Sequence, residues 1–202
     1  MQISSKVLLS VIALSGVMNG ASAALLDRGN GLIYDQDLNV TWLKNANVWQ
    51  NVRGGLVTWT TANDWAAQLE YADNLRSTVW TDWQLPTSEQ LRHLYYSELG
   101  GQAGIDLRYT HNSNYALFDN IQPGAYWSNT PWWSNPTEYV ETVSFYIGDT
   151  RSSNRINEFG YAWAMRAGDV GAVGVVPEPS TILLWLVGLL GMLYYRSIRP
   201  RA

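Results

Sequence analysis

The stretch WQLPTSEQL, residues 83–91, decides the fold because it predicts a strand that is followed at once by a helix. Pro86 ends the strand, since proline has no N–H to donate within a sheet. Thr87 and Gln90 have the spacing of a capping box, in which each side chain bonds the backbone N–H of the other residue at the start of a helix. Apolar residues continue this helix as far as Gly100, which is a typical helix terminator.

Two further elements are predicted upstream of this stretch. Residues 32–34 and 40–43 are short β-prone runs on either side of a polar segment, which predicts a hairpin with a longer loop. Thr60 or Thr61 can cap a helix that runs to about Ala72. Three residues of this helix recur at helical spacing and predict a buried stripe: Trp65, Leu69 and Ala72.

Downstream, strands are predicted after an asparagine-rich loop, at residues 126–128, 139–147 and 161–166. The two helices thus precede most of the strands, an order typical of an α+β fold rather than of a doubly wound parallel sheet. We therefore expect two helices, a mainly antiparallel sheet and long loops. Trp127 and Trp163, which lie within predicted strands, are expected in the core.

Composition excludes several classes of function. The chain of 202 residues has no cysteine, so thiol catalysis and thiolate metal sites are excluded. Its net charge is −4, and four of the 13 basic residues but only one of the 17 acidic residues lie in the terminal segments described below. The middle of the chain is therefore more acidic than the whole, which argues against nucleic acid as a partner.

The first 23 residues have the three parts of a secretory signal peptide: Lys6, an apolar run, and the small-residue motif Ala21-Ser22-Ala23. An N-terminal membrane anchor is the alternative, but the apolar run is short for a span. We expect export by the Sec system, cleavage by signal peptidase, and a domain at residues 24–167 that works outside the cytoplasm.

The C-terminal end predicts a second membrane-directed segment. A glycine-rich spacer at residues 168–175 leads into residues 176–202, which contain an uncharged, largely apolar run from 182 to 195 followed by arginines. About 14 helical residues span roughly 21 Å, less than the ~30 Å of a hydrocarbon core. This short transmembrane helix suits a transient insertion in the inner membrane, with its basic end inside and the domain outside.

This tail resembles the PEP-CTERM sorting signal. The resemblance implies recognition by an exosortase, a membrane protease that would remove the tail and release the protein to the cell surface or the extracellular matrix. An ordinary tail anchor is the alternative. The matching residues are Pro177, Glu178, Pro179, Arg196, Arg199 and Arg201.

The central domain resembles the Lcl C-terminal domain family. The resemblance covers most of residues 25–168 and is carried by four stretches: residues 31–42, 83–91, 126–128 and 162–166. Gln84 stands where arginine is common, and Asn129 where serine or threonine is common. The resemblance implies a C-type-lectin-like fold and adhesion to glycans or matrix.

Residues 126–135 interleave aromatic rings with amides and hydroxyls, a composition that suits the apolar faces and polar edges of sugars. Trp132 and Trp133 follow a proline, and two adjacent rings there do not easily both point inward. With Asn129 and Tyr139 they form the predicted glycan-binding set. Packing within the loop is the alternative.

No cofactor is required by the sequence, although lectin-like domains often use calcium, which carboxylate and amide oxygens bind. The candidate calcium ligands are Asp106, Asp119, Asn129 and Glu138. No fixed spacing singles them out, so solvated loop residues are the alternative.

An enzyme is not expected. The chain has two histidines, His93 and His111, which excludes a three-histidine metal site, and no carboxylate pair is singled out by spacing. The main hypothesis is therefore a surface or matrix protein that binds an extracellular polysaccharide. The second is a structural matrix component that works through protein contacts.

Overall fold

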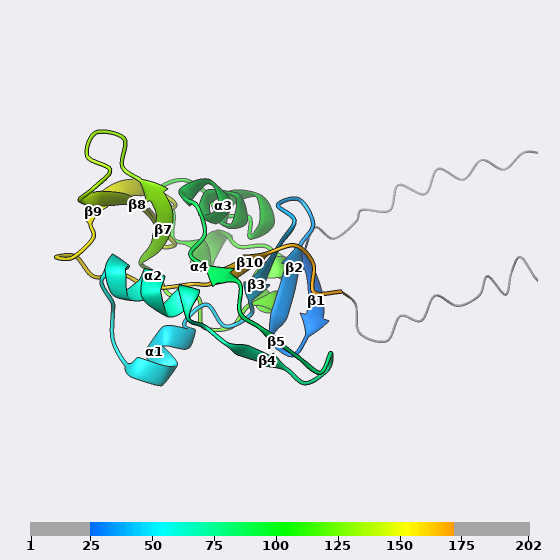
Figure 1. The fold of residues 1–202 in the computed structure, drawn as a ribbon. Coiled ribbons are helices and arrows are strands. Elements are labelled where there is room, and N and C mark those ends of the chain that lie inside the picture. Colours follow the sequence, from blue (N-terminus) through cyan, green and yellow to red (C-terminus); the bar gives the residue numbers. More distant parts are fainter. Residues whose placement is uncertain (1–24, 172–202) are drawn as a thin grey trace, which may run out of the picture.

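A five-stranded antiparallel sheet forms the base of the fold in the computed structural model, which describes residues 25–171 (Figure 1). Its strands in spatial order are β1 (Leu25–Gly29), β2 (Leu32–Asp35), β3 (Val40–Leu43), β10 (Met165–Ala167) and β6 (Trp83–Gln84). The last strand in the sequence thus lies between the predicted hairpin and the strand of residues 83–84. All four residues of β3 are buried, because it occupies the middle of this sheet.

The predicted hairpin is confirmed, since β2 and β3 pair antiparallel with Ile33 opposite Trp42. The loop between them returns through Asn39, which has a φ of 50°, a left-handed conformation that asparagine tolerates better than most residues. The predicted strand 161–166 is shorter than expected, because only residues 165–167 pair with β3 and β6.

A second, three-stranded sheet contains β7 (Ala125–Pro131), β8 (Tyr139–Ser144) and β9 (Thr150–Asn154). It lies at the opposite end of the molecule from β1 and β2 (Figure 1). The predicted strand 139–147 ends early, at Ser144, because residues 145–147 turn toward β9. A separate hairpin, β4 (Tyr71–Asp73) with β5 (Thr78–Trp80), was not predicted.

Helices are more numerous and shorter than expected. The described residues form α1 (Val48–Arg53), α2 (Trp59–Ala67), α3 (Ser88–His93) and α4 (Leu107–Thr110), together with a π-helix, η1 (Leu94–Glu98), and a 3₁₀ helix, η2 (Ser113–Leu117). The prediction that the helix after Thr60 runs to Ala72 is wrong, because Tyr71 pairs with Trp80 in a strand. Its buried face consists of Ala62 and Ala66 rather than the predicted stripe.

The capping box at the start of α3 is confirmed. The Gln90 N–H donates to the Thr87 hydroxyl over 3.1 Å, and the Gln90 side chain accepts from the Thr87 N–H over 2.8 Å. The same junction contacts β7, since the Ser88 N–H donates to the Thr130 hydroxyl. The strand-to-helix stretch thereby joins the two sheets.

Tryptophan rings fill the core between the sheets, as predicted for Trp127 and Trp163. Both are 1% exposed. The Trp163 indole N–H donates to the Leu43 carbonyl over 2.7 Å, and its ring centroid lies 5.6 Å from that of Trp42. The Trp127 indole N–H likewise donates to the Val57 carbonyl over 2.7 Å. The N–H group of both buried rings therefore has a hydrogen-bond acceptor within the protein.

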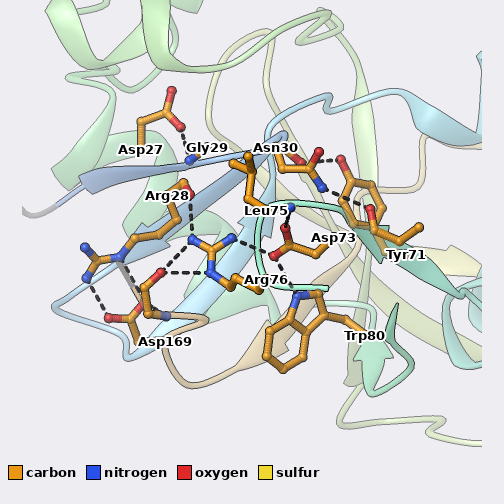
Figure 2. A network of polar contacts seen from close by, with 12 residues as sticks. Asp27, Arg28, Gly29, Asn30, Tyr71, Asp73, Leu75, Arg76, Trp80 and Asp169 are labelled. Atoms are coloured by element: carbon orange, nitrogen blue, oxygen red, sulfur yellow. Dashed lines mark hydrogen bonds and ion pairs between the residues drawn. The ribbon is translucent and has the colours of Figure 1, made fainter. Parts of the chain in front are cut away.

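Both ends of the described chain are tied together by an arginine network (Figure 2). Arg28 of β1 forms a two-point ion pair with Asp169, with distances of 2.9 and 2.5 Å. Arg76 donates to Asp73 over 2.6 Å and also to the Gly171 carbonyl. Residues 168–171, the start of the predicted glycine-rich spacer, contact the domain through these hydrogen bonds, and Val170 is buried.

No helix within residues 25–171 has the length and apolarity needed to cross a membrane. The predicted signal peptide at 1–23 and the predicted sorting signal at 176–202 lie outside the described residues.

Candidate functional site

The loop between β7 and β8, residues 132–138, presents the most exposed aromatic surface of the second sheet. Trp133 is 81% exposed, and its ring centroid lies 6.4 Å from that of the half-buried Trp132. The hairpin is closed by a hydrogen bond of 3.0 Å from the Trp132 N–H to the Tyr139 carbonyl. A fixed backbone thus places a large apolar ring in water, where it is available to a ligand.

The same loop forms one wall of a groove with a volume of about 410 Å³. We call this feature the Trp59 groove. Its lining residues come from the start of α2, the end of the β7–β8 loop and the end of β9: Trp59, Thr60, Thr137, Glu138, Asn154, Arg155, Ile156 and Asn157. It combines one indole with hydroxyls, amides and a guanidinium, so it offers both apolar and hydrogen-bonding contacts.

Trp59 and Arg155 form the centre of the groove. The Arg155 guanidinium carbon lies 4.1 Å from the Trp59 ring centroid, a cation–π geometry. The Trp59 indole N–H donates to the Ser128 carbonyl over 2.8 Å, which fixes the ring against β7. The guanidinium is held from its other side by a 2.8 Å hydrogen bond to the Pro136 carbonyl.

Arg155 lacks a counter-ion, because none of the ion pairs within residues 25–171 includes it. Its Nε is buried and has no hydrogen-bond partner in the described part of the chain. A buried N–H without an acceptor costs roughly 1–3 kcal/mol. The groove therefore contains a guanidinium without an ion-pair partner, together with the carboxylate of Glu138, and the buried Nε is not open to a ligand in the groove.

The predicted glycan-binding residues all belong to the β7–β8 hairpin, so the structure brings them onto one element. Asn129 is exposed, and its backbone N–H donates to the Pro86 carbonyl. Tyr139 is half-buried at the start of β8. None of the four predicted residues lines the Trp59 groove; the hairpin contributes Thr137 and Glu138 instead.

The groove residues Trp59 and Arg155 were missed by sequence reasoning. The aromatic content of residues 126–135 pointed to a hairpin that contributes to the groove, but Trp59 and Arg155 are separated by nearly half of the 202-residue chain. Trp59 is the first residue of α2, and Arg155 directly follows β9. No local sequence pattern predicts that these two places meet, so only the tertiary structure reveals the contact between the two side chains.

The candidate calcium ligands are not brought together as one site. Asp106 caps α4 and forms an ion pair with Arg108, whose hydrogen bonds lower the pKa of this carboxyl. Asp119 bridges to Asn45 through its backbone. Glu138 accepts a hydrogen bond from Asn135. Within residues 25–171, no group of three His, Asp or Glu side chains close enough to share a metal ion includes any of these three carboxylates.

Among the residues that line the Trp59 groove, the titratable groups are Glu138 and Arg155. A single carboxylate and an arginine do not supply both the base and the acid that most hydrolytic mechanisms need.

A comparison with protein-family models matches residues 31–187 to the Lcl C-terminal domain. The matched region includes the predicted hairpin, the capping-box stretch and the whole Trp59 groove. No similar sequence was found among curated proteins.

Proposed function

Because the chain belongs to the Lcl C-terminal domain family, which suggests an extracellular or surface protein, we propose that it binds an extracellular polysaccharide through the β7–β8 loop and the Trp59 groove. The observation that carries this proposal is the combination of an 81% exposed Trp133 with a groove that the same loop helps to form.

Sugar recognition requires an apolar surface for the C–H face of the ring and polar groups for its hydroxyls. Trp133 supplies the first, since an indole is flat and apolar with a polar handle. Thr60, Thr137 and Asn157 supply the second, because all three are exposed residues that line the groove. A groove of this size accommodates a short stretch of polysaccharide rather than a whole chain.

The charge of Arg155 indicates which class of sugar the groove would prefer. Its guanidinium is included in no ion pair of residues 25–171, and a guanidinium is a favourable partner for a carboxylate. We propose that the polysaccharide carries uronic acid or similar acidic groups. Glu138 lines the same groove, so the proposal is that Arg155 binds the acidic group of the sugar while Glu138 accepts hydrogen bonds from its hydroxyls.

Export and processing form part of the same proposal. The signal peptide would direct the chain through the inner membrane, and the tail would be inserted transiently and cut by an exosortase. The domain would then have a C-type-lectin-like architecture at the cell surface or in the matrix, next to the polysaccharide that it binds.

The experiment is a pull-down of the purified full chain by immobilised exopolysaccharide, followed by an array of neutral and acidic oligosaccharides. Retention on the polysaccharide, with preference for acidic oligosaccharides, is expected. Absence of binding to every glycan, with and without calcium, would refute the proposal.

A second candidate is a structural matrix protein that acts through protein contacts. It is favoured by two apolar residues near the end of β9, Ile156 and Phe159, which are 68% and 62% exposed. Such a protein should self-associate in sedimentation experiments even in excess sugar, and the association should weaken when Ile156 and Phe159 are replaced by serine. A glycan binder should remain monomeric under the same conditions.

A further inference from the structure

A group of three metal-ligating side chains lies between the β2–β3 hairpin and the α3–η1 helix, away from the Trp59 groove. The ligand atoms of Asp35, His93 and Glu98 all lie within 4.8 Å of one another. Asp35 is at the end of β2, His93 is the last residue of α3, and Glu98 is the last residue of η1.

The two carboxylates are buried without a lysine or arginine as partner. Asp35 is fully buried and Glu98 is 3% exposed. Within residues 25–171, no lysine or arginine forms an ion pair with either. Burial raises the pKa of both groups, and for Glu98 the nearby Asp35 adds to the effect. Two carboxylates in such surroundings require a compensating cation or proton.

The π-helix aligns two of these ligands. Residues five apart in an α-helix differ by about 140° in direction, so His93 and Glu98 would point to different faces. In η1 the Leu99 N–H instead donates to the Leu94 carbonyl over 2.9 Å, five residues earlier. This wider turn places the His93 Nε2 3.2 Å from a Glu98 carboxylate oxygen. Single π-turns are rare and are concentrated at functional sites.

We infer that Asp35, His93 and Glu98 bind a divalent transition-metal ion of the zinc class. One imidazole nitrogen with carboxylate oxygens is a donor set that zinc accepts, at distances near 2.0–2.2 Å. Two ligands on a tetrahedral zinc then lie about 3.4 Å apart, close to the 3.2 Å between His93 and Glu98.

Asp37 lies beside the group of three, on the side of His93. Its carboxylate lies 3.9 Å from the His93 Nε2 and is 59% exposed, whereas the His93 side chain is 25% exposed. The ion would therefore enter from the solvent side, past Asp37. Asp35 is pre-positioned for coordination, since it accepts hydrogen bonds from the Leu38 N–H (3.0 Å) and the Trp42 indole (3.3 Å).

The proposed site would join the hairpin to the helix. Because a metal that binds the folded state alone stabilises it by mass action, zinc should raise the melting temperature of the chain. The site is separate from the proposed glycan contacts, so its occupancy is expected to change stability without being required for binding at the groove.

The test is calorimetric titration of the chelator-treated full chain, in mild detergent, with zinc chloride, alongside thermal melts. One ion per chain and a higher melting temperature are expected. The variants Glu98→Gln and His93→Gln should each weaken zinc binding at least tenfold, while Glu70→Gln, at an exposed position between α2 and β4, should leave it unchanged.

Far-UV circular dichroism shows whether each variant is folded. If Glu98→Gln does not fold, His93→Gln decides the question, because the His93 side chain is partly exposed. Absence of zinc binding by the wild type, or equal zinc affinity in wild type and His93→Gln, would overturn the inference.

Discussion

The Arg76 guanidinium donates two hydrogen bonds to the carbonyl oxygen of Gly171, over 3.0 and 2.6 Å. It also donates to the Arg28 carbonyl, and so it joins the β4–β5 hairpin to both ends of the described chain (Figure 2). The C-terminal end of the domain is therefore held by side-chain contacts and not only by the strand β10.

Replacing Arg76 with alanine should destabilise the domain by about 3 kcal/mol, because it leaves Asp73 as a buried charge without its partner. The free energy of urea unfolding of the full chain measures this loss. Arg151→Ala is the matched control: it removes another Arg–Asp pair, but the Arg151 side chain is 71% exposed, so less than about 1 kcal/mol is expected. Equal losses in the two variants would contradict the assignment.

Lowering the pH should weaken the hydrogen-bond network around Arg76, because the carboxylate of Asp73 becomes protonated. Burial alone would raise the pKa of Asp73, but hydrogen bonds from Arg76 and Trp80 outweigh it and lower the pKa below the ordinary 3.8. A carboxyl with a lowered folded-state pKa contributes stability above its unfolded pKa, and this contribution is lost as the pH falls through the folded value.

The variant Asp73→Asn should accordingly be less stable than wild type at pH 6, with a difference that shrinks below about pH 4. Urea unfolding at a series of pH values measures the difference. Asp64→Asn, at an exposed position on α2, should show no such trend. A difference between wild type and Asp73→Asn that is constant with pH would be inconsistent with the network.

Trp133→Ala should weaken polysaccharide binding about tenfold, since a lost ring contact of roughly 1.4 kcal/mol corresponds to that factor. Tyr109→Ala is the control, because Tyr109 is also 81% exposed but belongs to α4. Binding is measured by titration with the oligosaccharide selected on the array. If both variants bind like wild type, Trp133 does not contact the glycan.

Arg155→Gln should reduce binding of acidic oligosaccharides at least tenfold and leave neutral ones within about twofold, because only the acidic sugars have a carboxylate to pair with the guanidinium. Arg151→Gln removes a charge from β9, outside the groove, and should have little effect. Equal loss for acidic and neutral sugars would indicate that Arg155 only supports the shape of the groove.

Thr87→Ala should lower the free energy of unfolding by about 1 kcal/mol, the usual contribution of a helix N-cap. The hydroxyl that accepts the Gln90 N–H is removed, whereas the reciprocal bond from the Thr87 backbone N–H to the Gln90 side chain keeps both of its partners. Thr81→Ala, at an exposed position before β6, is the control in the same urea experiment. A change below about 0.3 kcal/mol would show that the capping box does not contribute.

The sequence alone was sufficient wherever a feature depends on near neighbours. The β2–β3 hairpin, the capping box of Thr87 with Gln90 and the burial of Trp127 follow from turn chemistry, local hydrogen bonds and alternation. These signals act over a few residues, so they can be read without knowledge of the remaining chain. The same kind of reasoning identified the aromatic loop at Trp132 and Trp133.

Tertiary structure decided everything that joins distant segments. The helix predicted to reach Ala72 ends at Ala67, because Tyr71 gains a strand partner in Trp80. The pairing of Trp59 with Arg155, and the convergence of Asp35 on Glu98, arise only when separate elements pack. Local sequence specifies the conformation of a segment, whereas the burial of apolar surface decides which segments pack together. Both candidate binding sites lie where segments that are distant in the sequence pack against each other.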